Sequence, residues 1–350
     1  MAASSTTLRR IGFTAVAFGL FVGGAELAAR LYEYITYGTM HVDGAPIGLY
    51  GPPDPHGGRT LQPGASLEGS AGNIHVNSMG FRGVEISAQK PPNTVRVWCL
   101  GGSTTFDILA TEDFNTWPAK LEAHLREKVA PVNVEVINAG IPGEHVNTNL
   151  RDLRRKGPGL SPDLVIIHQG PNDLRSIANQ KFPPIFPKPS LVSGMSAYRV
   201  LWDFLPPPLP NNDWADRTLD VADMGELRRG IDNLVSEAQR QGALPVIASH
   251  GFAASKDGGD REAWWRLGRD ARGYGLTPTG LVRAYEAMNG MFSDIAAQRG
   301  VPFVDLRNAV GTDPEHWGDG IHFSDAGADR AGRLLADALV DGNHVQVRRR

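Results

Sequence analysis

The chain has 350 residues, enough for one large domain or two of ordinary size. Hydrophobic residues make up 41% of the chain and charged residues 21%, a composition that excludes an intrinsically disordered protein. The formal net charge of -3, and the lack of a stripe in which basic and aromatic residues alternate, argue against nucleic acid as a partner. The single cysteine, Cys99, excludes an intrachain disulfide, and its position inside an apolar run predicts a buried thiol.

The first 37 residues have the pattern of a membrane-targeting segment. A basic pair, Arg9-Arg10, precedes the uncharged run 11–25, and the apolar pattern resumes after Glu26. A spanning helix needs about 20 apolar residues and a signal-peptide core about 7–15, so the run falls between the two classes. Three aromatic residues resemble an interfacial belt: Tyr32, Tyr34 and Tyr37. We therefore interpret residues 1–37 as an uncleaved signal anchor.

Two alternatives compete with the anchor. The segment Gly23-Gly24-Ala25 has the small side chains of a cleavage site, so a secreted protein with a cleaved signal peptide is the first. A buried helix of a soluble protein is the second, and the basic flank at the extreme terminus disfavours it. The anchor and the cleaved signal both place the rest of the chain outside the cytoplasm, in the periplasm or the extracellular space.

Residues 38–93 are rich in glycine and proline, which indicates an irregular stem and lead-in to a domain. Within this segment, residues 73–76 predict a short strand and residues 77–83 a tight turn.

A β–α rhythm begins at Thr94 and defines a domain over residues 94–345. Five short apolar runs predict strands, at residues 95–100, 132–137, 164–168, 244–249 and 303–306. The third is apolar through Ile167, as expected for a central parallel strand that is buried on both faces. Four segments between or after the strands have helical spacing, and Ser324 is the expected N-cap of the last one. This alternation predicts a three-layer α/β/α domain with a parallel sheet.

One insertion breaks the rhythm. Residues from about 176 to 220 are rich in proline and form too long a segment for a simple connection in a compact domain. A lid or substrate-binding role and a surface excursion that merely packs onto the domain are equally compatible with this pattern.

Four polar motifs stand after predicted strands or in the last loop before the final helix. They are Gly101-Gly102-Ser103-Thr104, Asn138-Ala139-Gly140-Ile141-Pro142-Gly143, Gly170-Pro171-Asn172-Asp173 and Asp319-Gly320-Ile321-His322. In an open α/β sheet the ligand crevice lies at the carboxyl ends of the strands, so the motifs are expected to meet at one edge. Together they supply a serine, a base, a carboxylate and hydrogen-bond donors, which is a complete set for acyl transfer.

These motifs, in this order, resemble the four blocks of the SGNH (GDSL-like) hydrolase family, over about residues 94–340. The resemblance implies a five-stranded, flavodoxin-like parallel sheet and a serine esterase or acyl hydrolase activity. The chain departs from the family at two positions. Gly102 replaces the aspartate of the usual Gly-Asp-Ser, and Asp107 stands where glycine is common.

The chemistry assigns a role to each residue. Ser103 is the expected nucleophile, His322 the base and then the acid, and Asp319 the carboxylate that orients the imidazole. The expected oxyanion donors are the backbone N–H groups of Ser103 and Gly143 and the side-chain amide of Asn172. The choice of Gly143 over Gly140 follows the spacing of the family. We expect Asp173 to shape the turn that presents Asn172.

Competing assignments are weaker. His145, His168 and His250 also lie near strand ends, but none has a carboxylate three residues before it in the last loop. A metal cluster of His316, Asp319 and His322 uses these side chains less well than a triad does, so we expect neither metal nor cofactor. The sequence has no Gly-x-Ser-x-Gly elbow, no His-Glu-x-x-His motif and no phosphate-binding loop.

The expected protein is therefore a membrane-anchored esterase outside the cytoplasm. It would cleave an O-acyl or O-acetyl ester on a glycan or a lipid, through an acyl-serine intermediate. An O-acyltransferase with the same triad and a catalytically silent domain that binds the envelope are the alternatives.

Overall fold

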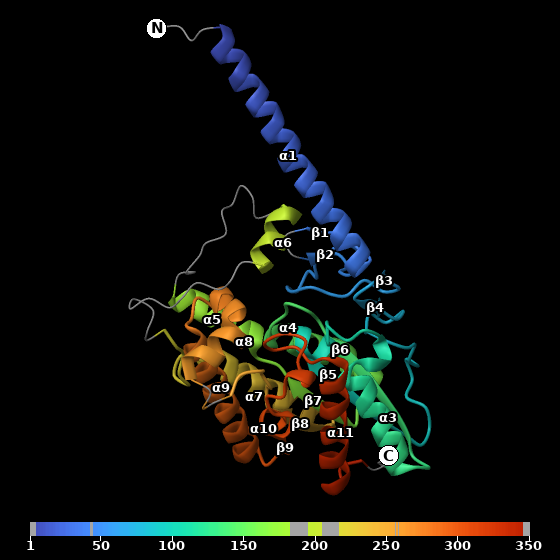
Figure 1. Cartoon of the computed structure of the whole chain (residues 1–350). Helices are drawn as coiled ribbons and strands as arrows, with labels where there is room; N and C mark the ends of the chain where they lie inside the picture. The colour runs from blue at the N-terminus through green and yellow to red at the C-terminus, as the bar shows by residue number, and fades with distance from the viewer. Residues whose placement is uncertain are drawn as a thin grey trace.

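The computed structural model describes residues 5–42, 45–182, 195–204, 217–255, 257 and 259–345. Its centre is a parallel sheet of five strands in the order β6-β5-β7-β8-β9 (Figure 1). The strands are β5 (Thr94–Gly101), β6 (Asn133–Gly140), β7 (Leu164–His168), β8 (Leu244–Ala248) and β9 (Phe303–Val304). This is the flavodoxin-like strand order, so the predicted α/β fold and its five strands are confirmed.

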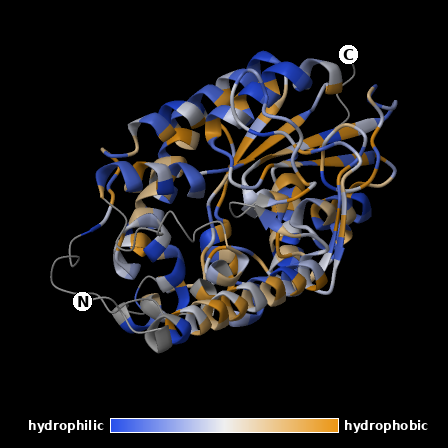
Figure 2. Ribbon diagram, turned by 90° about the horizontal axis from the view of Figure 1, so that it is seen from above, coloured by the Kyte–Doolittle hydropathy of each residue, from blue (hydrophilic) through white to orange (hydrophobic). Residues whose placement is uncertain are grey.

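Two apolar clusters cover the two faces of the sheet. On β5, the side chains of Val95 and Val97 belong to one cluster and those of Trp98 and Leu100 to the other, because successive residues of a strand point to opposite faces. The first cluster includes residues of α3 (Trp117–Val129) and α11 (Asp325–Asp341). The second includes residues of α4 (Val146–Leu160), α7 (Gly225–Arg240), α8 (Gly259–Tyr274) and α9 (Pro278–Arg299). The hydrophobic strands therefore lie between two helical layers (Figure 2).

The helix ends follow from local chemistry. The hydroxyl of Thr116 accepts a hydrogen bond from Ala119 N at the start of α3, and Pro118 occupies the first turn, where a missing N–H removes no helical bond. Ser324 accepts from Gly327 N, which confirms the predicted N-cap of α11. The predicted strand at 303–306 ends early, because Asp305 accepts from Asn308 N and starts α10 (Leu306–Val310).

The lead-in packs onto the domain. It contains two antiparallel pairs, β1 (His41–Val42) with β2 (Ala45–Pro46) and β3 (Ser66–Gly69) with β4 (Gly72–His75). A third apolar cluster joins four of its residues to two residues beyond β5 and β6: Leu49, Leu61, Leu67 and Val76 contact Phe106 and Ile141. The lead-in therefore covers the carboxyl edge of the sheet.

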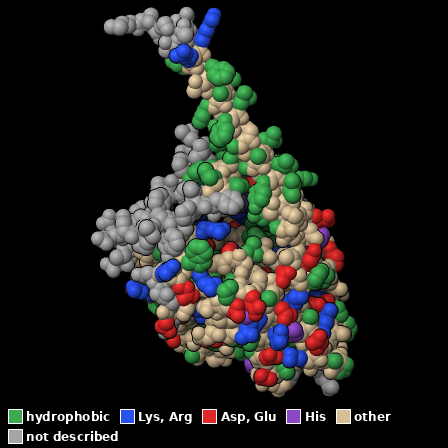
Figure 3. Space-filling view, in the orientation of Figure 1, with side chains coloured by type: hydrophobic (Ala, Val, Ile, Leu, Met, Phe, Trp, Pro, Cys, Tyr) green, Lys and Arg blue, Asp and Glu red, His purple; other side chains and the backbone are tan. Residues whose placement is uncertain are grey.

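Helix α1 (Ser5–Tyr37) projects from the lead-in (Figure 1). The candidate span Arg9–Tyr37 has 29 residues and a mean hydropathy of 1.7, and none of its most apolar window is buried, so the alternative of a buried soluble helix is wrong. Figure 3 shows hydrophobic side chains along this helix and basic ones at its outer end, over a body of mixed charge. Such a helix is consistent with a signal anchor or a signal peptide.

The proline-rich insertion is described in part. Its beginning lies in α5 (Pro171–Lys181), and its centre forms α6 (Ser196–Phe204). The prolines at 183–189 and 206–210 lie outside the described residues. Helix α6 packs against α1, and Ser196 N and Ala197 N donate to the Glu26 carboxylate at 3.1 and 3.0 Å. The charge that interrupts the apolar N-terminal run is thus the N-terminal cap of α6.

Candidate active site

Ser103 lies where β5 turns into the short helix α2 (Ser103–Phe106). The turn is crowded. A Cβ added at Gly101 would overlap Thr105 and the His168 carbonyl, and one at Gly140 would overlap the Phe106 backbone. Both positions therefore require glycine for close approach of the chain. Gly101 pairs with Gly140 of β6 and with His168 of β7, so three strands end at the same level beside Ser103.

Three predicted residues are joined by hydrogen bonds. His322 Nε2 lies 2.8 Å from Ser103 Oγ, and His322 Nδ1 lies 2.8 Å from Asp319 Oδ2. The other oxygen of Asp319 accepts from the backbone N–H groups of Ile321 and His322, at 2.9 and 2.8 Å. The carboxylate is therefore fixed by its own loop, and the spacing of three residues places the imidazole between it and the serine.

The electrostatics of the pair favour the charged form of both groups. Burial lowers the pKa of His322, but the Asp319 carboxylate outweighs burial and holds this pKa above its ordinary value. Burial also raises the pKa of Asp319, while His322 and the two backbone N–H donors lower it to about 2. The site thus stabilises an imidazolium, which is the species that forms when a histidine takes the proton of a serine.

The candidate oxyanion donors lie around the serine. Gly143 has a φ of +80°, a left-handed conformation that favours glycine. Among the described residues, no acceptor is present for the backbone N–H of Ser103 or Gly143. The side-chain amide of Asn172 donates one N–H to Glu144 O at 2.9 Å, which leaves its second N–H available.

The loop before α4 is fastened to α5. The Asp173 carboxylate accepts from Val146 N at 3.1 Å and from Gln169 Nε2 at 3.0 Å. Burial raises the pKa of Asp173 to about 6. The carboxylate thus connects the turn that carries Asn172 with the loop that carries Gly143.

The departure at Asp107 has a structural reason. Asp107 caps α2 with a φ of +63°, in the left-handed region where glycine is common and aspartate is tolerated better than most residues. Its buried carboxylate accepts from Trp117 N at 2.8 Å, a bond that glycine lacks the side chain to make. Burial raises the pKa of this carboxyl to about 7.

Arg82, in the lead-in, supports the same turn and was missed by the sequence analysis. Its buried guanidinium donates to the carbonyls of Phe106 and Asp107 at 3.1 and 2.7 Å, and to Asp113 Oδ1 at 2.8 Å. Its partners are mainly backbone oxygens, which leave no trace in a sequence motif. The nucleophile turn therefore depends on a residue outside the α/β domain.

The competing histidines do not reach Ser103. His168 and His250 are fully buried beneath the site, with ring centroids 5.2 Å apart. Burial lowers the pKa of His168 to about 4 and that of His250 well below its ordinary value, so both are neutral near neutral pH. His145 lies at the start of α4, on the wall of the pocket described next.

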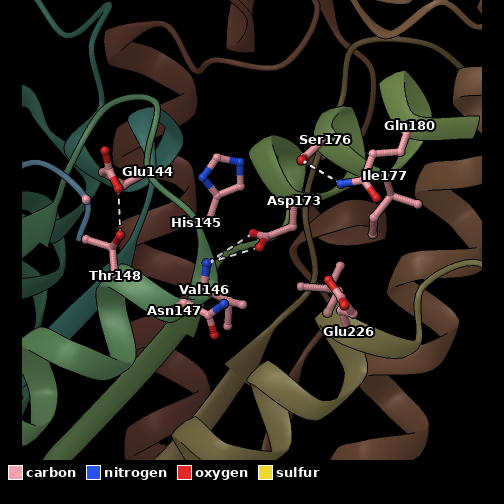
Figure 4. A pocket seen from close by; sticks show the side chains of 12 residues that line it. Glu144, His145, Val146, Asn147, Thr148, Asp173, Ser176, Ile177, Gln180 and Glu226 are labelled. Atoms are coloured by element: carbon pink, nitrogen blue, oxygen red, sulfur yellow. Dashed lines mark hydrogen bonds between the residues drawn. The ribbon is translucent and has the colours of Figure 1, made fainter. Parts of the chain in front are cut away.

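A polar pocket of about 360 Å³ lies beside the Asn172 loop (Figure 4). The first turns of α4 and α7 and one side of α5 form its walls, with Glu144, Asn147, Ser176, Gln180 and Glu226 among the lining residues. Figure 4 shows Asp173 between the side chains of His145 and Ser176. Among the described residues, no group of three or more His, Cys, Asp or Glu side chains is arranged to hold a metal ion.

Comparison with known families decides the assignment. The model of the GDSL-like lipase/acylhydrolase family matches residues 99–330, which is more than half of the chain. The chain belongs to this family. It is accordingly a carboxylic ester hydrolase of the GDSL (SGNH) type, as its motifs predict.

Solved structures of similar proteins cover 70–73% of the chain. A lipase/acylhydrolase from Enterococcus faecalis is 19% identical, with 73% of this chain and 100% of that chain covered and a TM-score of 0.43. Est24, a carbohydrate acetylesterase from Sinorhizobium meliloti, is 18% identical, with 71% and 99% covered and a TM-score of 0.43. TesA is 18% identical, with 70% and 97% covered and a TM-score of 0.43. A search of curated proteins gave no match.

Proposed function

We propose that this GDSL-family hydrolase is a membrane-anchored serine esterase that acts outside the cytoplasm through an acyl-Ser103 intermediate. The observation that carries the proposal is the continuous chain of hydrogen bonds from Ser103 through His322 to Asp319. A serine hydroxyl is a weak nucleophile unless a base takes its proton, and this arrangement places a base at hydrogen-bond distance.

The proposed steps are those of acyl transfer through a serine. Ser103 Oγ attacks the ester carbonyl while His322 Nε2 takes its proton. The carbonyl oxygen becomes an oxyanion, for which Ser103 N–H, Gly143 N–H and the Asn172 amide are the proposed donors. The C–O bond to the alcohol then breaks as His322 returns the proton to the leaving oxygen. Water repeats the sequence on the acyl-serine and releases the acid.

The polar pocket supports an alcohol rich in hydroxyl groups, such as a glycan or a lipid headgroup. Its carboxylate and amide side chains, including Glu144, Asn147 and Gln180, supply both acceptors and donors for hydroxyl groups. The backbone carbonyl of Glu144 also accepts a hydrogen bond from the side-chain amide of Asn172, so the pocket adjoins the proposed oxyanion site.

A fluorophosphonate probe tests the catalytic assignment. Probe labelling of the full-length protein is expected at Ser103, as located by peptide mass spectrometry. Labelling should be lost in Ser103→Ala and reduced by at least about 10³-fold in rate in His322→Ala. A labelled serine elsewhere would overturn the assignment. If the wild type and Ser103→Ala are equally inert on acetyl, butyryl and longer esters, the enzyme proposal fails.

Product analysis separates hydrolysis from transfer. With an acyl ester and a sugar acceptor present together, a hydrolase releases the free acid, and an acylated sugar in its place would show an acyltransferase.

The anchor and the side of the membrane need a separate test. An alkaline phosphatase reporter fused after residue 345 is expected to be active. The phosphatase folds only outside the cytoplasm, so its activity reports on which side of the membrane the domain lies. Mass spectrometry of the membrane fraction should find an N-terminal peptide that precedes Gly23. A mature chain that begins at Glu26 would instead show a cleaved signal peptide.

A further inference from the structure

An apolar pocket of about 190 Å³ lies at the base of α1, separate from the polar pocket. Its walls come from three parts of the chain: the end of α1 at Tyr37, the lead-in at Leu67 and Ile74, and the segment Ile108-Leu109-Ala110. Most of its lining residues precede residue 99, where the match to the family model begins. The pocket is therefore built largely by parts of this chain that the family model does not cover.

Two residues of one pocket wall, Ile108 and Leu109, contact the turn that carries Ser103 and the loop that carries His322. Ile108 N donates to Ser103 O at 3.2 Å, so one wall is tied to the nucleophile turn. Leu109 packs on Gly318, since a Cβ added at Gly318 would lie 2.7 Å from Leu109 Cδ1. Gly318 N in turn donates to the His322 carbonyl at 3.0 Å. A group seated in the pocket would thus touch Ile108 and Leu109, which connect it to the turn of Ser103 and to the loop of His322.

The size and lining of the pocket select an apolar occupant. Cavities of about 150 Å³ lined by aliphatic side chains hold a benzene molecule, so this pocket has room for about six carbon atoms. Leu67, Ile74, Ile108 and Leu109 provide aliphatic walls. Of the two parts of an ester, the acyl chain is the apolar one, and the polar pocket suits the alcohol.

We propose that this pocket holds the acyl chain of the substrate, so that α1 and the lead-in form part of the specificity site for a medium-length fatty acyl ester. The proposal rests on the proposed serine-esterase function and deepens it. The bonds made and broken are those of the acyl transfer above. Each buried methylene is expected to raise kcat/KM about fourfold.

The test uses the full-length protein in lipid nanodiscs and a series of p-nitrophenyl esters from acetyl to decanoyl. For the wild type, kcat/KM should rise by about 10²-fold from acetyl to hexanoyl and then level off. Ala71→Phe fills the pocket from an exposed position on its wall. For this variant, kcat/KM is expected to fall by at least about tenfold on the hexanoyl ester and to stay within about twofold of wild type on the acetyl ester.

The matched control, Ala297→Phe, adds the same side chain at an exposed position on α9. It should leave kcat/KM unchanged on both the acetyl and the hexanoyl ester. Leu109→Ala enlarges the pocket and should move the acyl length with the highest kcat/KM toward octanoyl. Because this is a gain of activity on a longer ester, it tests the proposal even if Ala71→Phe fails to fold. The proposal would be overturned if the wild type had its highest kcat/KM on the acetyl ester, or if the pocket variants lowered kcat/KM equally for all esters. The esterase function would stand in either case. Inactivity of the wild type on every ester would remove both.

Discussion

The two ends of α1 have different surroundings. Toward the N-terminus, Phe13, Phe18 and Leu20 are 77%, 67% and 74% exposed. Toward the C-terminus, Ala29 and Glu33 are buried, and Glu33 accepts hydrogen bonds from Ser196 Oγ and His41 N at 2.9 and 3.1 Å. The helix is thus bare toward its N-terminus, and toward its C-terminus it packs through the face that carries Ala29 and Glu33. The C-terminal end of the helix therefore belongs to the folded body that presents the catalytic edge, while its N-terminal end is exposed, which is consistent with a signal anchor or a signal peptide.

The largest expected effect is a loss of activity on substitution of Asp319, in the folded body. Asp319→Asn keeps the size of the side chain and removes the charge that holds the imidazole. We expect kcat to fall by about 10⁴-fold, with the thermal unfolding midpoint nearly unchanged. Hydrolysis of p-nitrophenyl acetate by the purified variant measures the first quantity, and Ser324→Ala, in the cap of α11, is the control. A loss below about tenfold would contradict the role of Asp319.

The second prediction asks whether the lead-in is an integral part of the body. Arg82→Ala removes the guanidinium that donates to Asp113 and to several carbonyls at the nucleophile turn. We expect a loss of about 3–5 kcal/mol in the free energy of unfolding. Arg82→Lys, which retains the charge, should recover part of it. If denaturant unfolding of Arg82→Ala differs from that of wild type by less than about 1 kcal/mol, the lead-in is dispensable.

The third prediction is a pH profile. Only neutral His322 accepts the serine proton, and the pKa of His322 is raised above its ordinary value by Asp319. The value of kcat/KM should therefore be constant at high pH and fall about tenfold per pH unit below the raised pKa. Asp319, whose pKa is about 2, stays ionised across the range from pH 5 to 9. A midpoint below the ordinary histidine value of about 6.5 would contradict the pairing.

The smallest effect is expected where α1 meets α6. Glu26→Ala removes the cap from Ser196 N and Ala197 N, at a cost of about 1 kcal/mol. Amide hydrogen exchange over residues 196–204 should become about fivefold faster. Phe13→Ala, on the bare end of the helix, should leave this exchange unchanged. Equal rates in Glu26→Ala and wild type would show that α1 and α6 are not coupled.

The sequence predicts the elements whose signal is local. The buried strand at Leu164 is continuous in its apolar residues, Ser324 stands directly before its helix, and Asp319 and His322 lie three residues apart in one loop. The hydrogen bond between Asp319 and His322 follows from this spacing. The hydrogen bond between His322 and Ser103 follows from the position of both loops at the edge where the parallel strands end.

Features that depend on distant partners escape such an analysis. Arg82 binds carbonyls 24 and 25 residues away, and Glu26 caps a helix 170 residues away. The left-handed conformation of Asp107 is a property of the turn, and a residue type that tolerates this conformation does not by itself predict it. Helix α6 is equally hidden, because prolines surround its nine residues on both sides.

The bond between Glu26 and Ser196 also has a consequence for biogenesis. The two residues are separated by 170 positions, and β5, β6 and β7 lie between them in the chain. At a synthesis rate of about 5–20 residues per second, roughly ten to thirty seconds pass between the appearance of Glu26 and that of its partner. Helix α1 is therefore complete before any strand of the central sheet exists, and it can dock onto α6 only after the ribosome has delivered the first three strands of that sheet.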